Sequence, residues 1–88
     1  MKLRGEFIVR SLSDDIVAIP VGQTALEFNG MILLNDVSKV IWECLGEECQ
    51  LSQLVSAVTD AFEVDPREAE ADILEYLSKL RESGLLEE

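Results

Sequence analysis

Residues 28–37 read FNGMILLNDV, and the hydrophobic period of the chain changes within this stretch. Asn29-Gly30 is a strong hairpin signal, because both central residues of a type I′ turn need positive φ. The four apolar residues 31–34 predict a strand after that turn. Beyond Asn35 the apolar residues recur at intervals of three and four, which predicts a helix. The stretch therefore predicts a change from a sheet on its N-terminal side to helices on its C-terminal side.

The residues before Gly30 predict an antiparallel meander. Strands are expected at 6–10, at 16–19 and at 24–28, where Leu26 and Phe28 would share one face. Pro20 ends the second of these strands because it has no N–H to give to the sheet. With residues 31–34 this makes an antiparallel sheet of three or four strands.

The residues after Leu34 predict three helices, at 36–45, 51–62 and 66–83. Asn35 or Asp36 is expected to cap the first helix. Asp65 and Pro66 suit the N-cap and first position of the third, and Gly84 suits its left-handed C-terminal cap. The pattern predicts a single winged-helix-like α+β domain over residues 1–88.

Composition limits the protein class. The 88 residues are 48% hydrophobic and include no histidine. That content is enough for a globular core, and no apolar run has the roughly 18 residues that span a membrane. The first six residues lack the apolar region of a signal peptide, so we expect a cytoplasmic protein without a membrane partner. Without histidine, the commonest general base and metal ligand is missing, and we expect no enzyme activity and no cofactor.

The charge distribution limits the partners. Seven basic and 18 acidic residues give a net charge of −11. Residues 1–10 carry three basic and one acidic side chain, or +2, which leaves four basic and 17 acidic, or −13, for residues 11–88. Such a surface repels phosphate backbones and anionic lipids. A protein or peptide partner, with a basic one favoured, is therefore expected, and nucleic acid is not.

Cys44 and Cys49 are the two cysteines. Two thiols without further ligands make a poor zinc site, so no metal site is expected. We interpret them as reduced thiols, with Cys44 on the apolar side of the first helix. A redox role stays open.

Two groups of residues resemble the PqqD family, named for a small protein of pyrroloquinoline quinone biosynthesis. The N-terminal group is Gly5-Glu6-Phe7, Ile19-Pro20-Val21-Gly22, Phe28-Asn29-Gly30 and Leu34-Asn35. The C-terminal group follows the pattern D-x3-[FY]-L-x2-L-x3-G-L-L from Asp72 to Leu86. Together they cover nearly the whole chain.

The resemblance implies a domain that recognises the leader segment of a ribosomally made precursor peptide and presents it to a maturation enzyme, such as a radical S-adenosylmethionine (radical SAM) protein. It implies that the leader adds as a strand beside residues 31–34, in a groove against the third helix. The implied peptide-binding residues are Gly30, Met31, Ile32, Leu33, Leu34, Asp72, Tyr76, Lys79, Leu80 and Ser83.

Alternatives stay open for several of these residues. Loops and the N-terminal strand could cover Met31 and Leu33, and Tyr76 suits a core role as well as a groove role. Asn35 is better explained as a helix cap than as a ligand contact. Trp42 is better explained as a packing residue, or as a contact to a partner enzyme, than as a stacking platform.

Other functions compete with leader binding. One is a docking subunit of a biosynthetic enzyme that binds no leader, and another is a winged-helix transcription regulator, which needs a basic face that the third helix lacks. An exposed edge strand can also pair with its own copy, so the protein is expected to be a monomer or a weak homodimer.

Overall fold

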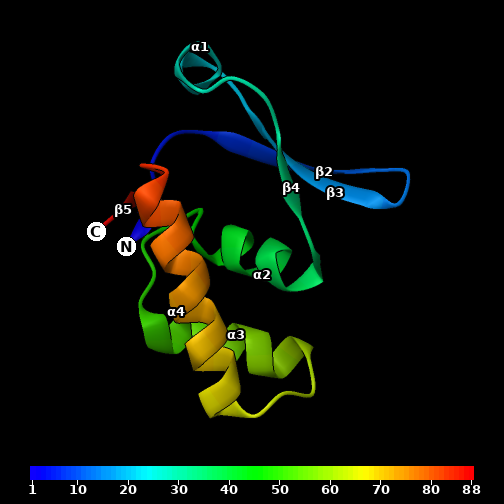
Figure 1. Ribbon diagram of the computed structural model, residues 1–88, viewed down its shortest axis with the longest axis vertical. Helices are drawn as coiled ribbons and strands as arrows, with labels where there is room; N and C mark the ends of the chain where they lie inside the picture. Colours follow the sequence, from blue (N-terminus) through cyan, green and yellow to red (C-terminus); the bar gives the residue numbers. More distant parts are fainter. The chain divides into compact units, whose positions relative to one another are not determined.

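A three-stranded sheet and a group of helices make up the computed structural model, which describes residues 1–88 (Figure 1). Their contacts divide the chain into two units. The sheet unit comprises Gly5–Lys39, and the helical unit comprises Met1–Arg4 with Val40–Glu88. No helix combines the length and the apolar character needed to cross a membrane.

The sheet unit holds β2 (Phe7–Leu12), β3 (Asp15–Pro20) and β4 (Ile32–Leu34). All pairs are antiparallel and the order is β2-β3-β4, so β3 is central and β4 is an edge strand. The predicted meander is thus confirmed with three strands. The predicted strands at 6–10, 16–19 and 31–34 all overlap observed ones.

The predicted strand at 24–28 is wrong, because this segment forms the short helix α1 (Gln23–Glu27). It contacts β3, and the segment is also tied to the residues at the start of β2. Thr24 Oγ1 accepts a hydrogen bond from the Glu6 N–H at 2.7 Å, and the rings of Phe28 and Phe7 meet edge to face at 5.9 Å. Leu26, which the alternating pattern placed beside Phe28, is 81% exposed. These tertiary contacts outweigh a weak local preference for strand.

The predicted type I′ hairpin at Asn29-Gly30 is also wrong. Gly30 has φ of 107°, a value that favours glycine, but Asn29 is not among the residues with positive φ. A type I′ turn requires positive φ at both positions. The segment Phe28–Met31 instead carries the chain from α1 to β4, which pairs with β3 through Ile16↔Leu34, Val17↔Leu33 and Ala18↔Ile32.

Three helices follow the sheet: α2 (Asp36–Cys44), α3 (Leu51–Ala61) and α4 (Pro66–Glu82). They confirm the three predicted helices within one residue at each end. The division between the units falls inside α2. The core of the helical unit is formed by Ile41, Trp42, Leu45, Cys49, Leu54, Val58, Ala69, Ile73, Leu77, Leu80, Leu85 and Leu86.

The ends of α4 follow the sequence signals. Asp65 is the N-cap and accepts a hydrogen bond from the Arg67 N–H at 2.8 Å, with Pro66 in the first turn. At the other end Gly84 has φ of 74°, and the Leu85 N–H reaches back to the Leu80 carbonyl at 2.9 Å. This is the bond of a Schellman motif, and it turns Leu85 into the core.

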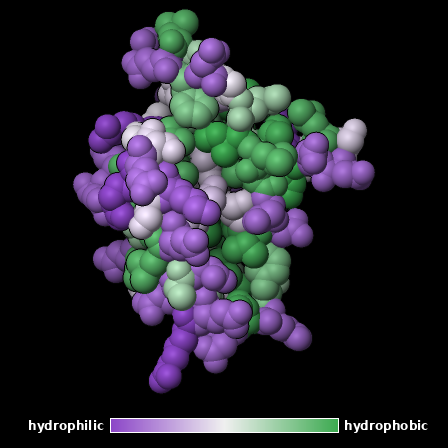
Figure 2. Space-filling model, viewed as in Figure 1, coloured by the Kyte–Doolittle hydropathy of each residue, from purple (hydrophilic) through white to green (hydrophobic).

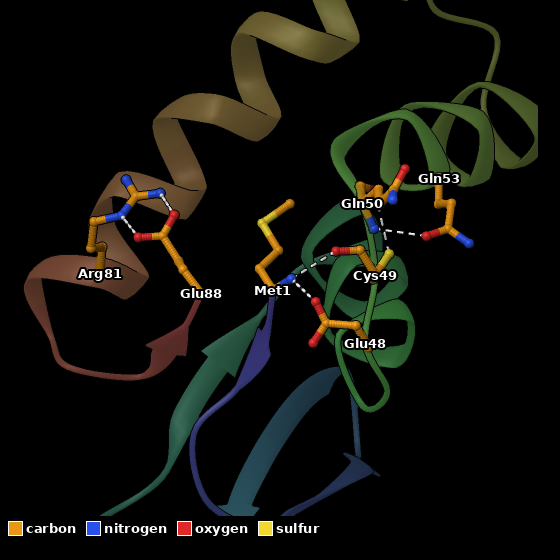
Figure 3. A network of polar contacts seen from close by, with 7 residues as sticks. All are labelled: Met1, Glu48, Cys49, Gln50, Gln53, Arg81 and Glu88. Atoms are coloured by element: carbon orange, nitrogen blue, oxygen red, sulfur yellow. Dashed lines mark hydrogen bonds and ion pairs between the residues drawn. The ribbon is translucent and has the colours of Figure 1, made fainter.

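A second, two-stranded sheet, which was not predicted, joins the chain ends. In the helical unit β1 (Lys2–Leu3) pairs with β5 (Leu86–Glu87). The Met1 ammonium donates to the Glu48 carboxylate and to the Cys49 carbonyl, and Arg81 holds Glu88 through two hydrogen bonds of 2.8 and 3.0 Å (Figure 3). Strands of two residues are too short to leave a hydrophobic period in the sequence.

Candidate functional site

The outer edge of β4 lies in the sheet unit, on the side away from β3. Because β4 ends the order β2-β3-β4, its N–H and C=O groups on that side have no strand beside them. Natural proteins usually protect such an edge with a lysine, a proline or a bulge. Residues 30–34 contain neither a charged residue nor a proline. Within the sheet unit, the outer edge of β4 therefore has neither a paired strand nor any of these protective residues.

The side chains along this edge alternate in exposure. Met31 is 60% and Leu33 is 69% exposed, whereas Ile32 is half-buried and Leu34 is only 6% exposed. The alternative that other parts of the chain cover Met31 and Leu33 is therefore wrong. At Gly30 the space around the backbone is open, with no atom within 4 Å of the position a Cβ would take. Successive strand residues thus point to opposite faces of the sheet, and Leu33 is exposed on its face although Val17 beside it is buried.

The strand register shows which residues share the face of Leu33. Leu33 stands opposite Val17, and Val17 stands opposite Arg10. Ile8, 38% exposed, and Leu12, 49% exposed, flank Arg10 on β2. Figure 2 shows hydrophobic residues gathered over the region of these strands, while hydrophilic residues dominate over α4. Ile8 and Leu12 were not predicted as site residues, although their spacing around Arg10 follows the period of a strand.

The predicted site residues on α4 lie in the helical unit. Asp72, Tyr76, Lys79 and Ser83 are spaced by four, three and four residues, which places them in one row along the helix. Asp72, Lys79 and Ser83 are exposed and Tyr76 is half-buried. Leu80 is 5% exposed and belongs to the core of the unit.

Tyr76 joins this row to the core. Its hydroxyl accepts a hydrogen bond from Trp42 Nε1 at 2.7 Å, and Trp42 is 2% exposed. The interpretation of Trp42 as a packing residue is confirmed. A buried indole N–H needs an acceptor, so Tyr76 has a structural role whether or not it also meets a ligand.

Asn35 is confirmed as a helix cap. Its Oδ1 accepts a hydrogen bond from the Ser38 N–H at 2.8 Å, and Ser38 Oγ accepts one from the Asn35 N–H at 2.7 Å. This reciprocal pair fixes the step from β4 into α2, so it also fixes where the edge strand ends. The N-x-x-S spacing is the signal in the sequence that indicates it.

The chain's two thiols could react or, together with its carboxylates, bind a metal ion. Burial raises the pKa of the Cys44 thiol, with a further increase from the neighbouring Cys49, and burial also raises the pKa of Cys49. Both thiols thus favour their neutral form, which is the less reactive one. No group of three or more His, Cys, Asp or Glu side chains is placed to hold a metal ion.

A shallow depression of about 290 Å³ lies between α3 and α4. It is lined by Ser52, Val55, Pro66, Arg67 and Glu70. Its volume is at the lower end of the range for small-molecule sites, which are also more enclosed. The edge of β4 is the stronger candidate for a binding site.

The predicted site residues thus form two groups. Gly30–Leu34 lie along one sheet edge, and Asp72–Ser83 along one helix. In the first group the side chains of Met31 and Leu33 are exposed. The side chain of Leu34 is buried, so this residue presents mainly its backbone groups. In the second, the exposed members are polar.

Comparisons with known proteins agree with this architecture. The family described as "Coenzyme PQQ synthesis protein D (PqqD)" matches residues 11–86. No curated protein matches the chain. The solved structure of "TbiB1 in Complex with the TbiA(beta) Leader Peptide" has a similar fold, with a TM-score of 0.73 and 24% sequence identity over 99% of this chain and 95% of that chain. Since the family match spans most of the sequence, the chain belongs to the PqqD family.

Proposed function

We propose that this protein binds the leader segment of a ribosomally made precursor peptide by adding it as a strand to the outer edge of β4. Two comparisons support the proposal: the chain's membership of the PqqD family, and its similarity in fold to TbiB1, whose solved structure is a complex with a leader peptide.

The observation that carries the proposal is the unprotected edge of β4. Strand addition uses backbone N–H and C=O groups for affinity and pockets for alternate side chains for specificity. The edge residues 31–34 supply unshielded backbone, and Met31 and Leu33 supply exposed apolar surface on one face. A leader with apolar residues at alternate positions would place these residues beside Met31 and Leu33.

The exposed row on α4 supplies the second part of the proposed interaction. Asp72, Lys79 and Ser83 can form hydrogen bonds or ion pairs with leader side chains or carbonyl groups. Lys79 is a cation in a protein of net charge −11, so it is the member best suited to an acidic leader residue. Leu80 is buried in the free protein, and we assign it a supporting role beneath this row.

The protein's part in maturation, on this proposal, is to hold the precursor without carrying out chemistry. The bound leader leaves the core segment free for a maturation enzyme, with a radical SAM protein as the leading partner. Both would meet in the cytosol, where ribosomes make the precursor.

Amide chemical shifts test the proposal. Synthetic leader peptides of candidate precursors are titrated into ¹⁵N-labelled protein, with the TbiA(β) leader as a comparison. We expect 1:1 binding around micromolar affinity, as for a small interface, and shifts concentrated at 30–34 and 72–83. Shifts confined to residues 46–62 would contradict strand addition.

A further inference from the structure

We propose that Cys44 and Cys49 are a modification site: a low-molecular-weight disulfide such as oxidised glutathione converts them to an intramolecular disulfide, which fixes the loop that holds β1. Both thiols are free in the structure, and both belong to the helical unit. Cys44 is the last residue of α2, and Cys49 lies in the connection to α3. The chain has two cysteines, so no other pair within it competes for this bond.

Backbone hydrogen bonds hold the two ends of this loop near each other. The Leu45 carbonyl accepts a hydrogen bond from the Leu3 N–H at 2.9 Å, and the Cys49 N–H donates one to the Met1 carbonyl at 2.8 Å. Positions 1 and 3 of an extended segment are about 7 Å apart, and this distance sets the spacing of residues 45 and 49. Cys44 directly precedes Leu45. The Cα atoms of a disulfide are usually about 4.4–6.8 Å apart, so the loop geometry is close to the one the bond needs.

The two side chains also meet. Burial is the main cause of the raised pKa of both thiols, and a side-chain hydrogen bond between Cys44 and Cys49 acts on the pKa of each as well. Two thiols in hydrogen-bond contact need little backbone movement to reach bonding distance. Because the thiolate is the reactive form and burial disfavours it, oxidation should be slow at neutral pH.

The exposure of the two thiols sets the order of the steps. Cys44 is half-buried, whereas Cys49 is 5% exposed. The Cys44 thiolate attacks oxidised glutathione and forms a mixed disulfide, while one glutathione leaves as a thiolate and takes up the proton that Cys44 lost. The Cys49 thiolate then attacks the Cys44 sulfur, the mixed disulfide breaks, and the second glutathione leaves with the proton from Cys49. The protein has lost two electrons and two protons, and one glutathione disulfide has become two thiols.

The bond acts on the part of the helical unit that joins the two ends of the chain. The loop bonds the segment of β1 on one side, and β1 pairs with β5 on the other through Leu3↔Leu86. The crosslink closes the six residues 44–49, which removes conformations from the unfolded chain. We expect it to shift the unfolding equilibrium toward the folded state by about tenfold or more. This effect is independent of leader binding, because it is measured on the protein alone.

Glutathione redox buffers near pH 8 test the proposal on the unmodified protein. Alkylation of free thiols followed by mass spectrometry gives the equilibrium constant for disulfide formation, both in the folded protein and in protein unfolded by urea. We expect an oxidised monomer and an equilibrium constant at least about tenfold larger in the folded protein. An equal or smaller constant in the folded protein would overturn the proposal, as would disulfide-linked dimers in place of the intramolecular bond.

Thermal unfolding gives an independent measure of the same factor, because the two comparisons close one thermodynamic cycle. A tenfold shift corresponds to about 1.4 kcal/mol and should raise the Tm of the oxidised protein by about 6–11 °C. An oxidised monomer with an unchanged or lower Tm would contradict the native proximity of the two thiols.

Cys49→Ser and Cys44→Ser are matched variants that each keep one thiol and test the order of the steps. With oxidised glutathione, the Cys49→Ser variant should form a mixed disulfide at Cys44 about tenfold faster than the Cys44→Ser variant forms one at Cys49, and the two rates should become similar in urea. Circular dichroism checks that each variant is folded. In the unmodified protein, acid quenching and peptide mapping should find the transient adduct on Cys44, and an adduct formed as readily on Cys49 would refute this order.

Hydrogen exchange locates the effect of the bond. The N–H groups of Leu3 and Cys49 close the contact between the loop and the segment of β1, so both should exchange more slowly after oxidation. Unchanged exchange at both amides in the oxidised monomer would show that the crosslink does not fix the loop that holds β1.

Discussion

Truncating Leu33 to alanine tests the leader-binding edge most directly. Leu33 is 69% exposed, so it contributes little to the core of the free protein. If a bound leader covers it, the apolar surface becomes buried only in the complex. The substitution should then weaken leader binding and leave the free energy of unfolding within about 0.5 kcal/mol of the original value.

The expected loss of leader-binding free energy follows from the exposed fraction of Leu33. Full burial of a leucine side chain is worth about 1.5–3 kcal/mol. Scaled by the exposed 69%, the contribution available to a ligand is about 1–2 kcal/mol. That range corresponds to an increase of roughly 5- to 30-fold in the Kd of the leader.

Isothermal titration calorimetry with the cognate leader gives the Kd. Leu74→Ala is the matched control, because it removes the same atoms from a leucine that is 48% exposed on α4. Equal affinities for the unmodified protein, Leu33→Ala and Leu74→Ala would show that the leader does not cover the open face of β4. The strand-addition geometry proposed here would then be wrong.

Three further predictions concern the core, the helix row and the thiols. Leu77→Ala should lower the free energy of unfolding by about 2–5 kcal/mol in urea titrations, because Leu77 is 2% exposed, and an unchanged midpoint would contradict its burial. Lys79→Glu should weaken leader binding by roughly 1–3 kcal/mol if Lys79 bonds the leader, whereas a change below ~0.5 kcal/mol would remove it from the site. Burial raises the pKa of Cys44 and Cys49 above 9.0, so their contribution to stability is complete below that pH and is lost as pH rises above it. Unfolding measured from pH 8 upward should show this decline, and a variant with alanine at both positions should show less of it.

The helices were predictable because local signals determine them. Asp65, Pro66 and Gly84 mark the ends of α4, and each performs the role expected of its residue type. The segment 24–28 lacked such signals: two apolar residues at alternate positions cannot separate a strand from one turn of helix. Its conformation depends on Thr24 meeting the Glu6 backbone and Phe28 meeting Phe7, which are contacts between segments about 20 residues apart.

The candidate site was predictable only in part, for a similar reason. The run 31–34 is apolar at every position, so the sequence could not indicate which side chains stay exposed. The folded chain decides it: Leu34 is 6% exposed, whereas Leu33 is 69% exposed although it stands opposite the buried Val17. The role of Tyr76 likewise depends on Trp42, which lies 34 residues earlier in the chain.

Net charge should make leader binding depend on salt in two separate ways. A basic leader is attracted to a chain of net charge −11, and this attraction raises the rate of association. The screening length is about 8–10 Å near physiological ionic strength, so the attraction acts at short range and fades as salt is added. The proposed backbone hydrogen bonds and the apolar contacts of Met31 and Leu33 change little with salt. Raising the salt concentration from about 0.05 to 0.5 M should therefore slow the association of a basic leader clearly, while its dissociation rate stays nearly constant. Stopped-flow measurements separate the two rates, and a dissociation rate that rises as steeply as the association rate falls would show that exposed charges, and not the edge of β4, hold the leader.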